Sequence, residues 1–174
     1  GLFTRTDPHR SLFTRRIVFP ILDRYGKVVA FGGRLISGDG PKYINSPETE
    51  LFQKRSLLYG LSQARDSIRR QRHAVIAEGY MDVIALHQAG VTNAVAPLGT
   101  SFTDEQAKLL TRSVDRVTLL FDADRAGVEA TRRAASILEA VEVQVDVVGL
   151  EPGDDPADIL KERGGQALID AVGS

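Results

Sequence analysis

Acidic residues follow three short apolar runs of the chain, where their carboxylates could hold a divalent cation. Glu78 follows one run directly, and Asp122 and Asp124 follow a second. The third acidic group lies further along the chain and consists of Asp154, Asp155 and Asp158. Oxygen ligands without His or Cys select Mg²⁺ or Mn²⁺ over Zn²⁺. A sparse cluster of such ligands is typical of a phosphoryl-transfer site, because Mg²⁺ also binds substrate phosphate.

The segments around these acids follow the pattern of a parallel α/β sheet. After residue 72, short apolar runs alternate with longer amphipathic stretches, which is typical of βαβ units. We expect strands over residues 74–77, 93–96, 117–121 and 143–148. We expect helices over residues 57–72, 81–89, 104–112, 126–140 and 156–163. Gly90 marks one helix end, and Thr103 with Gln106 predicts a capping box.

The acids are expected to gather at one edge of this sheet. In an open parallel sheet, ligands bind beyond the C-terminal ends of the strands, where helix N-termini favour anions. Asp122 and Asp124 are two residues apart, so both side chains can point toward one ion or a pair of ions. Helix capping is an alternative role for Asp124, since a helix is expected to begin near residue 126.

Two residues near the acids each have two roles open to them. Asp82 is either a further carboxylate near the metal or a favourable charge in the first turn of a helix. Arg125 either pairs with the acids or binds a substrate phosphate. Gly127, close to them in the sequence, is expected to let the backbone approach closely near phosphate.

The composition limits the class of protein. The chain has 174 residues, of which 43% are hydrophobic and 26% charged, enough for one domain with a smaller attachment. It has no Cys, which excludes disulfides and thiolate zinc sites and makes the cytoplasm the default expectation. No apolar run is long enough to span a bilayer, so no membrane partner is expected. The chain does not begin with Met, and we expect the natural protein to extend beyond it.

Charge is distributed unevenly along the chain. Residues 1–72 hold 14 Lys and Arg against 6 Asp and Glu, whereas residues 73–174 hold 8 against 17. A basic part can neutralise phosphates and an acidic part can hold metal, which suits a polyanionic partner handled together with cations. Two solvated surfaces of opposite sign are the alternative interpretation.

The basic part begins with a predicted β-hairpin. Residues 16–22 and 27–31 are apolar runs joined through a polar turn. Gly32 and Gly33 interrupt the strand pattern, and residues 42–49 are expected to be irregular and stiffened by Pro47.

These features together resemble the TOPRIM domain of bacterial replicative primases. The matching motifs are residues 78–82 (Glu-Gly-Tyr-Met-Asp), 96–100 (Ala-Pro-Leu-Gly-Thr) and 121–127 (Phe-Asp-Ala-Asp-Arg-Ala-Gly). Residues 16–21, 32–34 and 41–49 look like the stretch that precedes TOPRIM in primases specifically. The resemblance covers nearly the whole chain, and it is specific as a set although each motif alone is weak.

The resemblance implies a role for each matching residue. Glu78, Asp122 and Asp124 match the catalytic metal-binding acids, and Asp155 matches a further metal-binding acid. Possible additional acids are Asp82, Asp154 and Asp158. The family often has Asp where this chain has Ala157, which puts the role of Asp158 in doubt. Residues that match the nucleotide- or template-binding motif are Arg34, Lys42 and Asn45, and Arg125 is a further candidate.

The resemblance also implies a fold and its divisions. We expect an α/β fold, with a TOPRIM-type parallel sheet flanked by helices and preceded by a smaller mixed α+β subdomain with a β-hairpin. The expected divisions are residues 1–71 for the end of the basic N-terminal subdomain, 72–150 for TOPRIM, and 151–174 for an acidic loop and C-terminal helices.

The activity implied is Mg²⁺- or Mn²⁺-dependent nucleotidyl transfer that makes RNA primers at the bacterial replication fork. Its partners are a single-stranded DNA template, ribonucleoside triphosphates and the RNA primer. A replicative helicase and a zinc-binding domain are expected to engage other parts of a full-length primase, with no zinc bound in this segment.

Three other functions compete with this interpretation. A TOPRIM nuclease or a non-catalytic nucleic-acid-binding relative would not explain residues 41–49. A phosphatase of the Asp-x-Asp type places its acid pair after its first strand, whereas here the pair follows the third. A receiver-like phosphoacceptor module needs a Lys soon after its last strand, and none follows before Lys161.

Overall fold

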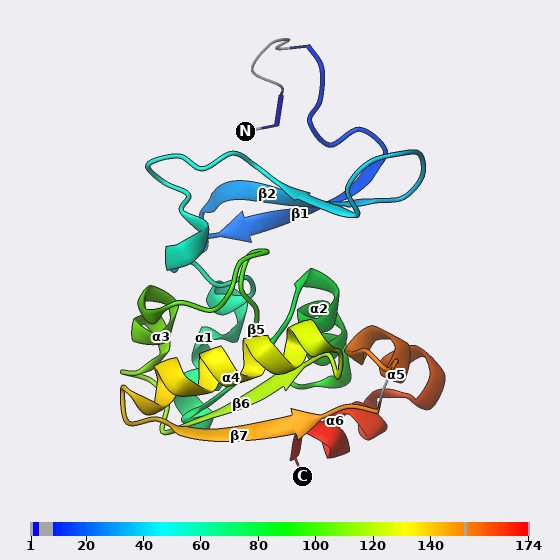
Figure 1. Ribbon diagram of the computed structural model, residues 1–174. Coiled ribbons are helices and arrows are strands. Elements are labelled where there is room, and N and C mark those ends of the chain that lie inside the picture. The colour runs from blue at the N-terminus through cyan, green and yellow to red at the C-terminus, as the bar shows by residue number, and fades with distance from the viewer. Residues whose placement is uncertain (1, 4–8, 152, 174) are drawn as a thin grey trace. The chain divides into compact units, whose positions relative to one another are not determined.

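The computed structural model describes residues 2–3, 9–151 and 153–173. The chain divides into two compact units, one up to Gln53 and one from Lys54 onward. The first unit contains three strands and the second a four-stranded sheet with helices on both faces (Figure 1). None of the described helices combines the length and apolar content needed to cross a membrane.

The first unit is a three-stranded antiparallel sheet in the order β1-β2-β3. Its strands are β1 Arg16–Leu22, β2 Val28–Leu35 and β3 Tyr43–Asn45. The predicted hairpin is confirmed, and its turn is held by Asp23, whose carboxylate accepts hydrogen bonds from the backbone N–H groups of Tyr25 (2.8 Å) and Lys27 (2.9 Å). Gly26 adopts a φ of 82°, a left-handed conformation that favours glycine in such a turn.

Two local predictions for this unit are wrong. Gly32 and Gly33 do not interrupt the strand, because β2 continues through them and pairs with β1 and β3 on either side. A Cβ on Gly33 would lie 2.5 Å from a ring carbon of Phe13, so the missing side chain makes room for that ring. The segment expected to be irregular contains β3, which pairs with the edge of β2.

The second unit is built on a parallel sheet in the order β5-β4-β6-β7. Its strands are β4 His73–Ala77, β5 Ala94–Val95, β6 Arg116–Phe121 and β7 Gln144–Gly149. All residues of β4 are buried, as are all but the first of β6. Central strands covered on both faces are expected to be continuously apolar.

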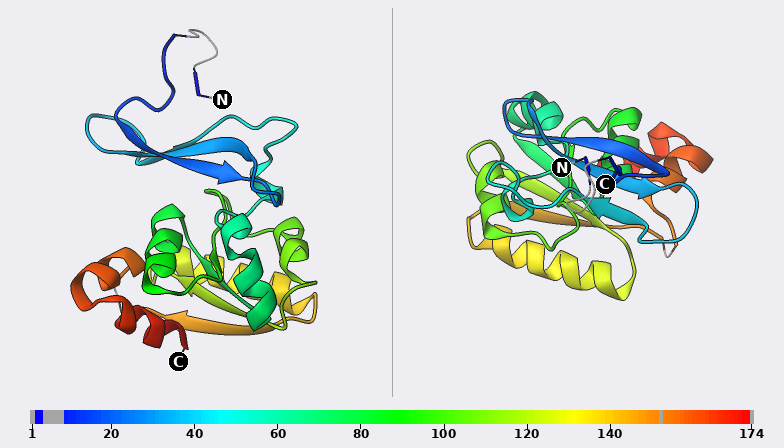
Figure 2. Two further views of the ribbon diagram at one scale, coloured as in Figure 1. Left: turned by 180° about the vertical axis from the view of Figure 1, so that it is seen from behind. Right: turned by 90° about the horizontal axis from the view of Figure 1, so that it is seen from above.

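Helices cover both faces of this sheet (Figure 2). Buried residues of α1 Leu61–Gln71, α3 Asp104–Leu110 and α4 Arg125–Glu139 pack on one face. Buried residues of α2 Tyr80–Ala89, α5 Pro156–Arg163 and α6 Gly165–Gly173 pack on the other. A short 3₁₀ turn, η1 Lys54–Ser56, precedes α1. The predicted α/β class, with a parallel sheet flanked by helices and a preceding hairpin, is therefore confirmed.

Most predicted element bounds in the second unit agree with the structure to within two residues, and the capping box of Thr103 with Gln106 is present. The start of α1 is the exception, because the helix begins at Leu61 instead of residue 57. Gly60 has a left-handed φ of 80°, and the backbone of Tyr59 bridges to Ala96. By compactness α1 lies with the second unit, whereas the division proposed at residue 72 followed the charge balance.

Candidate active site

Glu78 and Asp122 lie together at the C-terminal edge of the sheet. They follow β4 and β6, which are neighbouring parallel strands. The backbone N–H of Asp122 donates a hydrogen bond to Oε1 of Glu78 at 2.9 Å. Two acids that are 44 residues apart in sequence are therefore held side by side, as the strand pattern predicts.

Asp124 is the N-cap of α4. Its Oδ1 accepts a hydrogen bond from the backbone N–H of Gly127 at 2.8 Å. The capping role weighed from the sequence is therefore present. It does not exclude metal binding, since the cap uses one oxygen of the carboxylate and the helix N-terminus favours an anion there.

Gly127 allows the first turn of α4 to approach Glu78 and Asp122. A Cβ on Gly127 would lie 2.1 Å from the carbonyl oxygen of Asp122 and 2.9 Å from Oε1 of Glu78. Any side chain larger than hydrogen would push α4 away from the loop that carries Asp122. The structure thus gives the glycine a role in packing between parts of the chain, which was not expected from the sequence, and close approach to phosphate stays a prediction.

Asp82 lies beside the same group of acids. Its Oδ2 accepts a hydrogen bond from the backbone N–H of Gly79 at 2.9 Å, so it closes the first turn of α2. The pKa of Asp82 is raised to about 7, mainly because the carboxyl is shielded from water. The negative charges of Asp122, Asp155 and Glu78 raise it further, whereas the bond from Gly79 lowers it.

Glu78 experiences the same repulsion. Its pKa is raised first by desolvation, and the charges of Asp122 and Asp124 add to this shift. The hydrogen bond from the Asp122 backbone opposes it. Like charges at close range raise each other's pKa, so the direction of these shifts agrees with repulsion among acids of three separate loops.

The three acids of the third loop differ in their partners and in their exposure. Asp155 is the N-cap of α5, and its Oδ1 accepts a hydrogen bond from the backbone N–H of Asp158 at 2.7 Å. Asp154 forms an ion pair with Arg163. Asp158 is exposed in the first turn of α5. Of these three, Asp155 is the one whose charge acts on Asp82, so it belongs with the group around Glu78.

The side chains as they lie do not form a finished ligand set. Among the described residues, no three His, Cys, Asp or Glu side chains are arranged so that they could hold a metal ion. Several of the carboxylates instead bond to backbone N–H groups. The donor set nevertheless fits Mg²⁺ or Mn²⁺, because these ions take oxygen ligands and often use only one or two carboxylates plus water and phosphate.

The candidate nucleotide-binding residues Arg34, Lys42 and Asn45 lie on β2, just before β3 and in β3 of the first unit. The guanidinium of Arg34 lies 5.8 Å from the ring centre of Tyr43, and the Lys42 ammonium lies 5.9 Å from it. Arg34 and Tyr43 are paired across the strands, so they share a face of the sheet. The structure thus groups Arg34 and Lys42 around one aromatic ring.

Arg16 was not singled out from the sequence, yet it organises the same loop. Its Nη1 donates to the carbonyl oxygens of Gly33 (3.3 Å), Pro41 (2.9 Å) and Lys42 (3.4 Å). These bonds hold the loop between β2 and β3 and so position Lys42. No local pattern signals such a role, because the carbonyls lie 17 to 26 residues away.

Arg125 is the first residue of α4, and it is exposed next to Asp124. Its place beside Asp124 leaves both of its proposed roles open.

The parallel sheet with acids at its C-terminal edge defines a Toprim-like domain, and a family model described as Toprim-like matches residues 75–160. A second model, described as the N-terminal domain of the DNA primase catalytic core, matches residues 1–65.

The chain belongs to the bacterial DNA primase family. A DNA primase of Halalkalibacterium halodurans is 49% identical over 154 residues, which is 88% of this chain and 26% of the relative. The structure of the zinc-binding and RNA polymerase domains of the Aquifex aeolicus primase is 42% identical, with a TM-score of 0.89, over 94% of this chain and 41% of that one. A primase catalytic domain bound to single-stranded DNA is 37% identical, with a TM-score of 0.87, over 98% of this chain and 56% of that one.

This chain thus spans about a quarter of the length of the curated relative. The two family models between them match residues 1–65 and 75–160, so the likeness includes the basic and the acidic parts. The phosphatase and receiver-like interpretations do not agree with this family. The predicted resemblance to primases is confirmed.

Proposed function

We propose that this chain is the metal-binding and nucleotide-positioning segment of a primase that synthesises RNA primers on single-stranded DNA. The observation that carries the proposal is the contact between Glu78 and the Asp122 backbone, which gathers acids from separate loops at one sheet edge. A relative solved with single-stranded DNA supports a nucleic-acid partner. The cytoplasm, at the replication fork, is the proposed location.

The acidic edge would hold the metal. Glu78, Asp122 and Asp124 are the proposed catalytic ligands, and Asp155 is a further ligand. Bound Mg²⁺ or Mn²⁺ would neutralise charge on the triphosphate and lower the pKa of the attacking 3′ hydroxyl. Backbone N–H groups orient the carboxylates before the ion arrives, because each bond fixes one oxygen of its acid. Asp82 would support this set as a neighbouring carboxylate.

The basic residues would bind phosphates. Arg34, Lys42 and Asn45 are proposed to contact the nucleotide or the template backbone, and Arg125 a phosphate near the metal. Lys and Arg supply the sequence-independent part of nucleic-acid affinity. A replicative helicase and a zinc-binding domain are proposed partners of other parts of the full-length protein.

Charge-removing variants test the metal site. Asn caps helices about as well as Asp, so Asp122→Asn combined with Asp124→Asn removes two charges and preserves the N-cap of α4. Calorimetry with Mn²⁺ is expected to show binding to the unmodified chain and none to the double variant. Asp104→Asn, which alters an exposed acid in the first turn of α3, is the matched control and should bind normally. Unchanged binding in the double variant would remove the assignment.

A second measurement tests the basic residues separately. Lys42→Ala is expected to weaken binding of single-stranded DNA or nucleotide by a few-fold, roughly the loss of one phosphate contact, while Mn²⁺ binding is retained. Lys27→Ala, in the hairpin turn of the same unit, is the control. Equal loss of metal binding in Lys42→Ala would show that Lys42 acts on the acidic edge and does not bind phosphate.

A further inference from the structure

Gln106 is a fully buried polar side chain that does more than cap its helix. Its exposed fraction is 0%, and its Oε1 accepts a hydrogen bond from the backbone N–H of Thr103 at 3.1 Å, as a capping box requires. Its Nε2 donates to the carbonyl oxygens of Lys54 (3.0 Å) and Leu57 (2.8 Å). Both hydrogens of the amide nitrogen are therefore used on a segment about 50 residues earlier.

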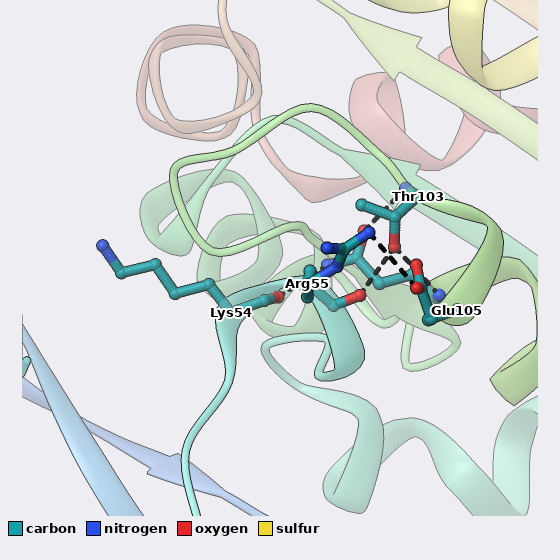
Figure 3. A network of polar contacts seen from close by, with 5 residues as sticks. Lys54, Arg55, Thr103 and Glu105 are labelled. Carbon is teal, nitrogen blue, oxygen red and sulfur yellow. Dashed lines mark hydrogen bonds and ion pairs between the residues drawn. The ribbon is translucent and has the colours of Figure 1, made fainter. Parts of the chain in front are cut away.

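Other contacts fasten the same segment, residues 54–59, to the loop that leads into α3. The hydroxyl of Thr103 donates to the carbonyl oxygen of Arg55 at 2.6 Å, and Arg55 forms an ion pair with Glu105 at 3.2 Å (Figure 3). The backbone N–H of Tyr59 donates to the carbonyl oxygen of Ala96 at 2.8 Å, with a reciprocal bond at 3.1 Å. Each end of the segment is thus tied to residues 96–106.

This segment is the point at which the chain enters the second unit. The first unit ends at Gln53 and carries the proposed phosphate-binding residues Arg34, Lys42 and Asn45. The second unit begins at Lys54 and carries the proposed metal-binding acids. Residues 54–57 therefore join the chain that carries the proposed phosphate-binding residues to the unit that carries the proposed metal-binding acids.

We propose that Gln106 is a positioning residue, whose amide anchors residues 54–57 to α3 and so fixes the path by which the chain enters the second unit. The inference rests on the proposed function for its consequence in nucleotide binding, although the anchor itself does not. A buried side chain with three bonds at its amide is expected to hold its partners firmly, because an unpaired buried group is costly.

The anchoring role and the capping role of Gln106 require different groups of its side chain. Glu is as suitable as Gln in a capping box, since only the side-chain oxygen is needed. Glu would fail as the anchor, because a carboxylate cannot donate and would face the carbonyl oxygens of Lys54 and Leu57. Gln106→Glu therefore has different expected outcomes under the two roles, whereas Gln106→Met loses both the cap and the anchor.

Trypsin provides a direct readout of the anchor, because it cleaves after Lys54 and Arg55. Cleavage after Arg132 and Arg133, in the middle of α4, reports unfolding of the whole unit and serves as the internal reference. We expect the ratio of cleavage at 54–55 to cleavage at 132–133 to rise roughly tenfold in both Gln106 variants, because two buried hydrogen bonds are lost. Gln88→Met, at an exposed position on α2, is the matched control.

Two outcomes would overturn the proposal that Gln106 anchors residues 54–57 to α3. A normal ratio in Gln106→Glu with a raised ratio in Gln106→Met would mean that Gln106 only caps α3. A normal ratio in both variants would remove any role in holding residues 54–57. Should Gln106→Glu lack the circular dichroism of the folded chain, a normal ratio in Gln106→Met still overturns the anchor, because Met can neither cap α3 nor bond to residues 54–57.

The consequence for nucleotide binding is measured in the same variants. In Gln106→Met, affinity for a ribonucleoside triphosphate in the presence of Mn²⁺ is expected to fall about tenfold, while affinity for Mn²⁺ alone stays unchanged. Equal loss of both would mean that Gln106 supports the metal site and does not position the chain. If the unmodified chain bound no Mn²⁺, the proposed function would fail, whereas the proteolysis result would still stand.

Discussion

Charged side chains have different kinds of partner at the two edges of the parallel sheet. At the N-terminal edge, oppositely charged side chains pair with each other, as in Arg72 with Asp115 and Arg116 with Asp146. At the C-terminal edge, Arg163 pairs with Asp154, but the carboxylates of Glu78, Asp82, Asp124 and Asp155 accept hydrogen bonds from backbone N–H groups.

The difference lies in what compensates the charges at each edge of the sheet. Ion pairs neutralise the N-terminal edge from within the chain. Backbone N–H groups orient carboxylates without cancelling their charge, so repulsion persists and the pKa values of Glu78 and Asp82 are raised. We propose that cations from outside the chain stabilise this edge.

The close approach of α4 to the acidic edge is expected to have the largest effect on the free energy of unfolding. Gly127→Ala would place a Cβ 2.1 Å from the carbonyl oxygen of Asp122, so we expect a loss of about 3 kcal/mol in the free energy of unfolding. Urea denaturation measures the change. Gly149→Ala, a strand glycine with no atom within 4 Å of the added Cβ, is the control and should change stability by less than about 1 kcal/mol. Similar values for both variants would mean that the contact at Gly127 is not tight.

Removing a charge from the acidic edge should stabilise the metal-free chain at high pH. The pKa of Asp82 rises from 3.8 to about 7 on folding, so the folded state binds this proton more tightly than the unfolded state. Its contribution to stability is therefore present below pH 3.8 and is lost as the pH rises toward 7. Asp82→Asn keeps a side-chain oxygen that can accept the hydrogen bond from the Gly79 N–H. Because Asn does not ionise, the variant is expected to avoid this loss in the free energy of unfolding, on the order of 2 kcal/mol.

Denaturation with EDTA present, at pH 5 and at pH 8, measures the effect of Asp82→Asn. The variant should be more stable than the unmodified chain at pH 8, and the gain should shrink at pH 5. Asp104→Asn, at an exposed acid outside the site, is the control. A gain that is equal at both pH values would show that the Asp82 carboxyl does not titrate in this range.

The N-terminal edge should respond to pH with the opposite sign and a smaller amplitude. The pKa of His73 is lowered from 6.5, first by burial and then by the charge of Arg116, although Asp146 opposes the shift. The unfolded chain therefore takes up this proton more readily, so the contribution of His73 is present above pH 6.5 and is lost as the pH falls.

His73→Gln should make stability less sensitive to acid between pH 7.5 and pH 5.5, since Gln can still bond to the Thr118 hydroxyl, which lies 2.8 Å from Nε2 of His73. The exposed His9, changed to Gln, is the control. An identical acid response in His73→Gln and the unmodified chain would contradict the assignment of this edge.

Local signals explain why much of the second unit could be predicted from the sequence. Its strands are apolar runs, and its helices have recognisable ends, such as Gly90, the Thr103–Gln106 capping box and Pro156. Parallel strands then place Glu78 and Asp122 at one edge as a matter of topology.

Features set by distant contacts could not be predicted in this way. The continuation of β2 through Gly33 depends on Phe13 lying over that glycine. The late start of α1 depends on Gly60, where a Cβ would lie 2.9 Å from Val83. The second role of Gln106 depends on carbonyls about 50 residues earlier, so the sequence showed only its capping box.

Diffraction from crystals grown with Mn²⁺, at a wavelength where manganese scatters anomalously, tests most directly whether the acidic edge shares divalent cations. We predict an anomalous peak bounded by the carboxylates of Glu78, Asp122 and Asp124, with Glu78 turned toward the ion. A peak confined to other carboxylates, or none under saturating Mn²⁺, would contradict the account of this edge as the metal-binding centre.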